Sequence, residues 1–301
     1  MKDVIKRVAA LPPDKQAMLL RQLKQTVNLQ TSNSLSAHPP LDKWVVRYRP
    51  NEQARLRLFC FPYAGGGASL FRAWLDALPP EVELCGIQLP GRESRLGEPA
   101  YTRIVPLVEA LAGAIVPYLD RPFAFYGHSM GALVSFELAR QLRRTYDKLP
   151  VSMYIAAYRA PQLPNPNIKI HHLPEEMFKV VLRADGIPEG ILQNQELMQA
   201  MLPTLRADLE LCDNYEYKEE LPLVCPFLIF GGQKDVRVNP ADLDLWRVHS
   251  SAPYRLSILP GSHFFLHSAQ DLLLTAIAQD LEMRLNMLEH TGMADAQTML
   301  A

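Results

Sequence analysis

A ten-residue stretch near the middle of the chain places a serine at a sharp turn between a strand and a helix. The apolar run at 123–126 leads into Gly-His-Ser-Met-Gly at 127–131, with Ser129 at its centre, and a helical pattern follows at once. A strained turn of this kind brings strand and helix so close that only glycine fits two residues to either side. The unpaired N–H groups at the helix start would then face negative charge formed at the serine.

Strand and helix patterns alternate around this turn. The pattern predicts helices over about 101–118, from the serine turn to 146, and over about 268–288, and strands at 44–48, 56–61, 82–89, 123–128, 151–157, 226–230 and 254–259. Alternation of this kind predicts an α/β protein with a mostly parallel sheet and helices on both faces. A Gly-x-Ser-x-Gly turn in that context is typical of the α/β-hydrolase fold, which we therefore expect.

Composition divides the chain into three parts. Residues 1–40 combine a helical pattern, broken at Pro12-Pro13, with a polar linker at 31–40. We expect this extension either to dock onto a larger assembly or to pack on its own domain. The hydrolase domain should span 41–288, and residues 289–301 are polar and uncapped, which predicts a frayed tail.

A long interval, about 161–222, interrupts the alternation and predicts a helical lid over the sheet. Its helical patterns at 174–185 and 194–215 are rich in methionine and leucine. Such side chains suit an adaptable acyl-binding surface, and they equally suit a small core of the lid's own. Candidate substrate contacts are Met177 and Phe178 in the lid, with Tyr63 and Phe264 on loops that follow strands.

Charge and cysteine usage exclude several classes of function. A net charge of −1 gives no electrostatic basis for binding nucleic acid or an anionic membrane. No apolar run approaches the roughly 20 residues that span a bilayer, and the N-terminus lacks a signal-peptide pattern. The four cysteines are widely spaced without a Cys-x-x-Cys pair, so we expect buried thiols in a reducing cytoplasm.

Two further residues complete a candidate catalytic triad. A serine hydroxyl is a weak nucleophile at neutral pH and needs a base, which in turn needs an orienting carboxylate. In the expected fold the chain order is serine, acid, histidine, each at the end of a strand. Asp235 follows the strand at 226–230 and His263 follows the strand at 254–259. We therefore expect Ser129, Asp235 and His263 to act together.

The other histidines and two aspartates of the lid are weaker candidates for a catalytic role. His267, at the start of the closing helix, is the second candidate for the base, and His128 occupies a position that is usually supporting. No histidine pair has a carboxylate at metal-ligand spacing, so we expect no metal. The remaining candidates are expected to face solvent on the lid: His171, His172, Asp208 and Asp213.

The glycine-rich loop at 61–68 should complete an oxyanion hole. Its sequence is Phe-Pro-Tyr-Ala-Gly-Gly-Gly-Ala, and its glycines let backbone N–H groups approach a substrate closely. We expect one donor from this loop and a second from the Met130 N–H. The spacing fits neither of the common nucleotide-binding glycine patterns, which disfavours a nucleotide site.

Five motifs in register carry a family resemblance. They are Phe-Pro-Tyr-Ala-Gly-Gly at 61–66, Gln-Leu-Pro-Gly-Arg at 88–92, the serine turn at 127–131, Gly-Gly-x-x-Asp at 231–235 and Gly-x-His-Phe-Phe at 261–265. Over about residues 44–285 the chain resembles the type II thioesterases that accompany non-ribosomal peptide and polyketide synthases. A Pro-Gly-Arg turn is usual in that family, and we interpret it here as structural. Tyr158 stands where a smaller residue is expected, which predicts a narrower acyl pocket.

The resemblance implies roles for the candidate residues. Ser129 would be the nucleophile, His263 the general base and acid, and Asp235 its orienting carboxylate. Ala64 and Met130 would supply the oxyanion N–H groups. The implied reaction is hydrolysis of acyl or aminoacyl groups from the phosphopantetheine arm of acyl or peptidyl carrier protein domains, without a cofactor of the enzyme's own. The alternatives are a product-releasing thioesterase that cyclises or transfers the chain, and a non-catalytic carrier-binding module.

Overall fold

Seven strands form one sheet in the order β1-β3-β2-β4-β5-β6-β7. Every neighbouring pair is parallel except β1 with β3. The computed structural model describes residues 43–165, 169–184 and 189–299, so the predicted extension at 1–40 lies outside the described residues. The strands are β1 (Val45–Arg47), β2 (Leu56–Phe61), β3 (Val82–Ile87), β4 (Phe123–His128), β5 (Ser152–Ala156), β6 (Phe227–Gly232) and β7 (Tyr254–Leu259).

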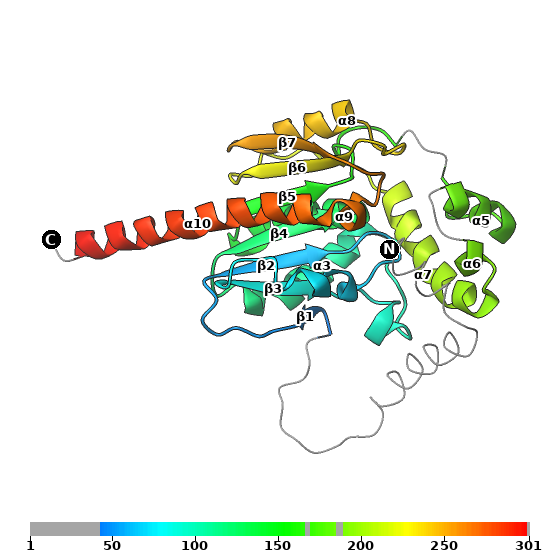
Figure 1. Cartoon of the computed structure of the whole chain (residues 1–301), viewed down its shortest axis with the longest axis horizontal. Helices are drawn as coiled ribbons and strands as arrows, with labels where there is room; N and C mark the ends of the chain where they lie inside the picture. The colour runs from blue at the N-terminus through cyan, green and yellow to red at the C-terminus, as the bar shows by residue number, and fades with distance from the viewer. Residues whose placement is uncertain (1–42, 166–168, 185–188, 300–301) are drawn as a thin grey trace, which may run out of the picture.

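Helices cover both faces of this sheet, as Figure 1 shows. One face packs on α3 (Ile104–Ile115), α4 (Met130–Tyr146) and the region of α8 (Pro240–Asp244). The other packs on the 3₁₀ segment η1 (Ala68–Trp74), α9 (Phe265–Ser268) and α10 (Gln270–Met299). Side chains of β2 alternate between the two cores, Phe59 and Phe61 on the α4 side and Leu58 and Cys60 on the α10 side. The α/β-hydrolase fold expected from the sequence is confirmed.

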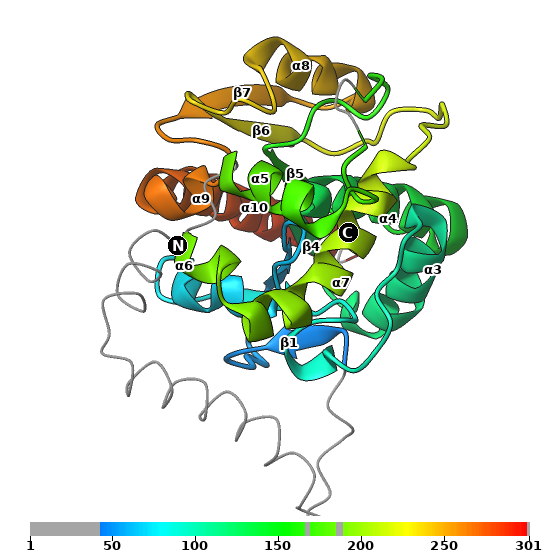
Figure 2. The ribbon, with the colours of Figure 1, turned by 90° about the vertical axis from the view of Figure 1, so that its right-hand side faces the viewer.

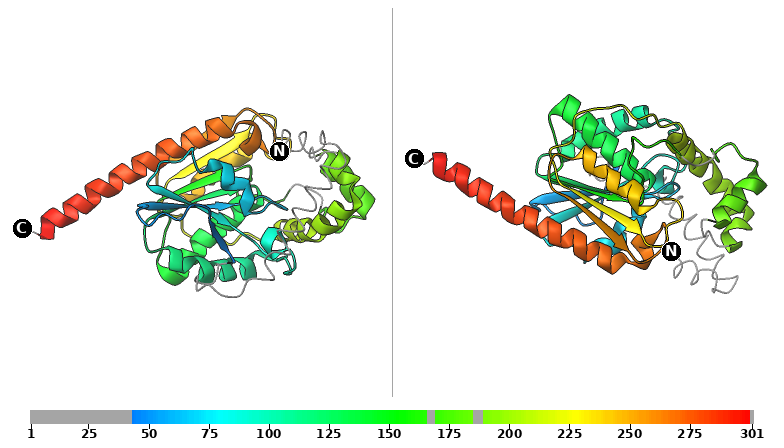
Figure 3. Two further views of the ribbon diagram at one scale, coloured as in Figure 1. Left: turned by 60° about the horizontal axis from the view of Figure 1, so that its bottom comes forward. Right: turned by 90° about the horizontal axis from the view of Figure 1, so that it is seen from above.

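The C-terminal helix is longer than the sequence pattern predicted. We expected it to end near 288 and the residues beyond to be frayed, whereas α10 continues to Met299. Its first half packs on the sheet, and its last turns extend past the end of the sheet opposite the lid (Figures 1 and 3). The sequence after Glu289 contains no proline, and its one glycine, Gly292, lies within the helix without ending it.

Three helices lie over the carboxyl ends of the parallel strands (Figure 2). They are α5 (Glu175–Ala184), α6 (Glu189–Leu192) and α7 (Gln195–Asp213), within the interval from which a lid was predicted. The Asn194 side chain caps α7 by accepting the N–H of Leu197 at 3.0 Å. The lid has a small core of its own, formed by Phe178, Leu182, Leu192, Met198 and Leu202.

All four cysteines are free, and the thiols of Cys60, Cys85 and Cys225 are buried as expected. Among the helices that the structure describes, none has the length and apolarity to cross a membrane. The described ranges also hold no group of three side chains placed to share a metal ion.

Candidate active site

Ser129 lies between β4 and α4 in a strained backbone conformation, with φ 53° and ψ −121°. Its N–H donates to the carbonyl of Ala156 at the end of β5, at 2.8 Å. A Cβ on Gly127 would lie 2.3 Å from the carbonyl oxygen of Gly131, and a Cβ on Gly131 would lie 2.2 Å from that of Phe61. Glycine at both positions therefore lets β4, α4 and the end of β2 converge on the serine.

The three predicted triad residues come together at the ends of three strands. The Oγ of Ser129 lies 2.9 Å from Nε2 of His263, and Nδ1 of His263 lies 2.9 Å from Oδ2 of Asp235. Because the carboxylate accepts a hydrogen bond from the N–H at Nδ1, the hydrogen-bond network assigns the free lone pair to Nε2, where it faces the serine hydroxyl. The arrangement can take the serine proton as the hydroxyl attacks.

The Asp235 carboxylate is held on its other side by backbone. Its Oδ1 accepts the N–H groups of Arg237 at 2.8 Å and Val238 at 3.2 Å, and the side chain is fully buried. These bonds fix the direction of the carboxylate, so the carboxylate orients the imidazole of His263.

The two other histidines near the site make supporting contacts. His128 is fully buried, and its Nε2 donates to the backbone carbonyl of His263 at 2.8 Å. Burial, aided by the neighbouring His263, lowers the pKa of His128 well below its usual value, so this imidazole is neutral. His267 bonds the Tyr63 hydroxyl through Nε2 at 3.2 Å, and burial lowers the pKa of His267 to about 4. Neither contact makes a base for Ser129.

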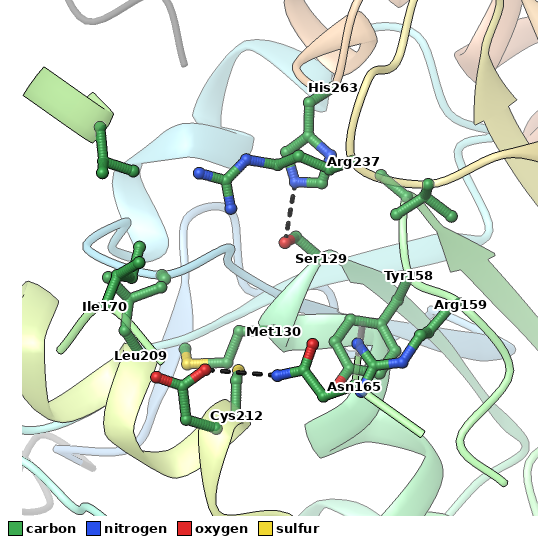
Figure 4. A pocket seen from close by; sticks show the side chains of 15 residues that line it. Ser129, Met130, Tyr158, Arg159, Asn165, Ile170, Leu209, Cys212, Arg237 and His263 are labelled. Atoms are coloured by element: carbon green, nitrogen blue, oxygen red, sulfur yellow. Dashed lines mark hydrogen bonds between the residues drawn. The ribbon is translucent and has the colours of Figure 1, made fainter. Parts of the chain in front are cut away.

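Two cavities meet at Ser129. One, of about 450 Å³, is lined by Tyr158 and Asn165 (Figure 4) and by Asp213. The other, of about 290 Å³, runs along the glycine-rich loop and has mostly apolar walls. Both share five wall residues: Ala64, Ser129, Leu209, Arg237 and His263. A substrate bound across the serine can therefore extend in two directions.

The predicted oxyanion donors lie in these walls. Met130, which lines the first cavity, is the first residue of α4, and the opening N–H groups of a helix have no partner within the helix. Ala64 belongs to the loop after β2, where the N–H of Gly66 closes a turn on the carbonyl of Tyr63 at 2.8 Å. Gly65 takes a left-handed φ of +75° that favours glycine.

The candidate substrate contacts separate into two pairs. Tyr63 and Phe264 line the second cavity. Met177 and Phe178 do not belong to the walls of either cavity. The Met177 side chain is 55% exposed on the outer face of α5, whereas Phe178 is buried in the lid core. Val181 and Leu182, one turn further along α5, line the two cavities instead.

The prediction that Asp208 and Asp213 face solvent is wrong. Asp208 is 2% exposed and forms a bidentate ion pair with the buried Arg92, at 2.7 Å for both contacts. Asp213 pairs with Nδ1 of His171 at 2.7 Å, so His171 is also half-buried rather than free on the surface. A signal for Asp208 was present in the sequence, because it shares one face of α7 with Leu205, Leu209 and Cys212, at helical spacing.

Tyr158 lies in the wall of the first cavity, at the position where we expected a bulky ring to narrow the pocket. Its hydroxyl is buried without a hydrogen-bond partner among the described residues. Cys212 lines the same cavity, but burial raises the pKa of its thiol, which keeps it protonated and makes it a poor competing nucleophile.

Comparison with known proteins places this geometry in a family. A family model described as the thioesterase domain matches residues 56–285. This chain belongs to the thioesterase family. The match includes Ser129, Asp235, His263 and the glycine-rich loop, and it confirms the family expected from the five motifs.

Two similar proteins carry names from gramicidin S and borrelidin biosynthesis. It is 45% identical over 231 residues to the gramicidin S biosynthesis protein GrsT of Aneurinibacillus migulanus, which covers 76% of this chain and 90% of GrsT. It is 30% identical, with a TM-score of 0.73, to the solved structure of the type II thioesterase BorB from the borrelidin biosynthetic cluster, over 82% of this chain and 98% of BorB.

A third relative carries a different kind of name. The chain is 44% identical over 249 residues to the linear gramicidin dehydrogenase LgrE of Brevibacillus parabrevis, covering 81% of this chain and 95% of LgrE. The loop after β2 in this thioesterase lacks the Gly-x-Gly-x-x-Gly spacing of a dinucleotide site, and the chain places a serine, a histidine and an aspartate in hydrogen-bond contact. These features favour acyl transfer to water over hydride transfer.

Proposed function

We propose that this thioesterase hydrolyses acyl and aminoacyl thioesters from the phosphopantetheine arm of carrier protein domains in a non-ribosomal peptide or polyketide synthase. The observation that carries the proposal is the hydrogen-bonded chain from Asp235 through His263 to Ser129, at the meeting point of two cavities. The names of the relatives support the choice of synthase partner. Four free cysteines, three of them buried, are compatible with action in a reducing cytoplasm.

Acylation is the first half of the proposed reaction. Ser129 Oγ attacks the thioester carbonyl carbon while its proton passes to His263 Nε2. The Ala64 and Met130 N–H groups stabilise the oxyanion that forms. The carbon–sulfur bond then breaks, and His263 gives its proton to the departing sulfur. The arm leaves as a free thiol, and the acyl group remains as an ester on Ser129.

In hydrolysis of that ester, His263 acts first as a base towards water and then as an acid towards the serine. His263 takes a proton from water, and the resulting hydroxide attacks the ester carbonyl carbon. The bond to Ser129 Oγ breaks, and the proton returns from His263 to the serine. Asp235 stays ionised throughout and stabilises the imidazolium that forms in each half-reaction. The products are a free acid and a regenerated serine.

The two cavities suit the two parts of such a substrate. The mostly apolar cavity contacts Leu182 and Leu205 of the lid, so it offers a wall for hydrocarbon. The cavity beside Asn165 and Asp213 offers an amide and a carboxylate as hydrogen-bonding groups. A thioester carbonyl at Ser129 would place the acyl group in one cavity and the amide-containing arm in the other.

Product analysis with acyl-loaded carrier proteins tests the proposal. Incubation with carriers that bear short acyl, long acyl and aminoacyl groups should release the free acid and the free thiol of the arm. Exclusive formation of a ring or an ester would show a product-releasing thioesterase instead. A protein that binds carriers but leaves the thioester intact and does not react with a fluorophosphonate probe would be a binding module.

A further inference from the structure

A buried carboxylate of the lid contacts the glycine-rich loop that borders the site. Asp208 lies on α7, and its Oδ2 accepts the N–H of Gly65 at 2.7 Å. The same carboxylate accepts hydrogen bonds from both terminal nitrogens of Arg92, at 2.7 Å each. A lid residue is therefore bonded directly to backbone next to Ala64.

Arg92 extends this contact to the neighbouring peptide group. It is 5% exposed, and its Nη1 also donates to the carbonyl of Gly66 at 3.2 Å. Its Nε donates to the carbonyl of Pro90 at 3.2 Å, which ties the guanidinium to its own turn. Within this buried ion pair, Asp208 accepts the N–H of Gly65, and Arg92 donates to the carbonyl of Gly66.

We propose that Asp208, held by Arg92, is a positioning residue that fixes the backbone of the glycine-rich loop at 61–68, the predicted oxyanion loop. This inference rests on the proposed function, in which the Ala64 N–H stabilises the oxyanion. The Gly65 N–H belongs to the peptide unit that starts at the Ala64 carbonyl. Its bond to Asp208 therefore restrains the backbone rotation at Ala64 and, with it, the direction of the Ala64 N–H. Oxyanion donors act through geometry fixed before reaction, and a displacement of about 1 Å costs on the order of 10²-fold in rate.

The proposal gives the lid a part in the chemical step. Leu205 and Leu209 lie on the same helix as Asp208 and line the cavities at Ser129. The wall that contacts the substrate and the carboxylate that holds the oxyanion loop are therefore parts of one helix. Separation of α7 from the loop would remove the acceptor of Gly65 and Arg92, and with it the restraint on the loop.

A purely structural role for the ion pair predicts something different, and Thr204 provides the matched control. The Thr204 hydroxyl donates to the carbonyl of Gly91, so it also anchors α7 to the Pro-Gly-Arg turn, one residue from Arg92. Thr204→Val removes this second anchor and leaves the bonds to Gly65 and Gly66 in place. If anchoring of α7 is all that matters, both substitutions should act alike.

The experiment compares the full-length wild type with Asp208→Asn, Arg92→Lys and Thr204→Val. The Asp208 carboxylate accepts three N–H groups on its two oxygens, whereas an amide has only one acceptor oxygen, so Asp208→Asn must leave a donor unpaired. The readouts are kcat and KM for an acyl-pantetheine thioester, thermal melting, and the rate at which a fluorophosphonate labels Ser129. The labelling rate reports the oxyanion hole directly, because the phosphonyl oxygen occupies it.

Asp208→Asn should lower kcat and the labelling rate by about 10- to 100-fold, with KM within about twofold of wild type. Arg92→Lys should lower both rates by less, because a lysine ammonium keeps the charge but cannot form the bidentate pair. Thr204→Val should keep both rates near those of wild type. Arg92→Lys decides the question if Asp208→Asn does not fold.

Wild-type labelling rates in Asp208→Asn or a folded Arg92→Lys variant would overturn the inference, as would an equal loss in Thr204→Val. The labelling assay needs no carrier substrate. Slower labelling in Asp208→Asn would therefore support the inference even if wild type failed to hydrolyse carrier-bound thioesters, which would refute only the proposed function.

Discussion

Gly131→Ala should damage catalysis more than folding, because the added methyl group points at the start of the oxyanion loop. An added Cβ would lie 2.2 Å from the carbonyl oxygen of Phe61, 2.6 Å from its carbonyl carbon and 2.7 Å from the carbonyl oxygen of Pro62. All three are backbone atoms, and ordinary contact between such atoms begins near 3.5 Å. The end of β2 and the first helical turn of α4 must therefore separate by about an ångström.

Two magnitudes follow from that displacement. Overpacking of this kind costs about 1–3 kcal/mol in the free energy of unfolding, so Tm should fall by several degrees. A shift of about 1 Å between Ser129 and its oxyanion donors should lower kcat on the order of 10²-fold. The assays are thermal melting and steady-state hydrolysis of an acyl-pantetheine thioester at saturating substrate.

Gly113→Ala is the matched control. Gly113 lies on the exposed side of α3, and an added Cβ there meets no atom within 4 Å. Because alanine is the better helix former, this variant should gain up to about 1 kcal/mol in stability and keep full activity. Wild-type kcat in folded Gly131→Ala would refute the reasoning that close approach of α4 and the loop sets the oxyanion hole.

Three further outcomes follow from the same structure. Asp235→Asn should keep the fold and lower kcat by about 10⁴-fold, since an amide can favour the wrong imidazole tautomer; a loss under tenfold in a kinetic assay would contradict this role. His128→Phe should leave the His263 carbonyl without its donor, destabilising the fold by about 1–3 kcal/mol in denaturant titration and lowering kcat, whereas an unchanged protein would refute the supporting role. Burial lowers the pKa of His249 to about 4, so its contribution to stability is complete above pH 6.5 and is lost as pH falls from 6.5 towards 4. His249→Gln should lose less stability than wild type across that window, and parallel curves would show that this histidine does not titrate there.

The triad could be predicted because chain order and strand ends constrain it. Ser129, Asp235 and His263 each follow an apolar run, and in a parallel sheet the carboxyl ends of strands lie at one edge. The strands at 56–61 and 254–259 were placed to the residue, because turn or loop sequences bound each run on both sides. Local sequence was sufficient for these features.

Contacts between the lid and the sheet could not be predicted in the same way. The helical period of α7 shows that Asp208 shares a face with apolar residues, but it does not show that Arg92, 116 positions earlier, lies opposite. Periodicity likewise did not show that α5 turns Met177 outward and Val181 towards the cavity. Such pairings depend on how the lid packs on the loops beneath it, which is a property of the whole fold.

Single-turnover hydrolysis by Ser129→Ala tests the central claim most directly. The variant keeps the buried environment of the turn, so its melting curve should match that of wild type. Release of free acid from an acylated carrier protein should fall by at least about 10⁴-fold, without an acyl-enzyme intermediate. Hydrolysis at the wild-type rate by the folded variant would show that Ser129 is not the nucleophile and would contradict the mechanism proposed for this thioesterase.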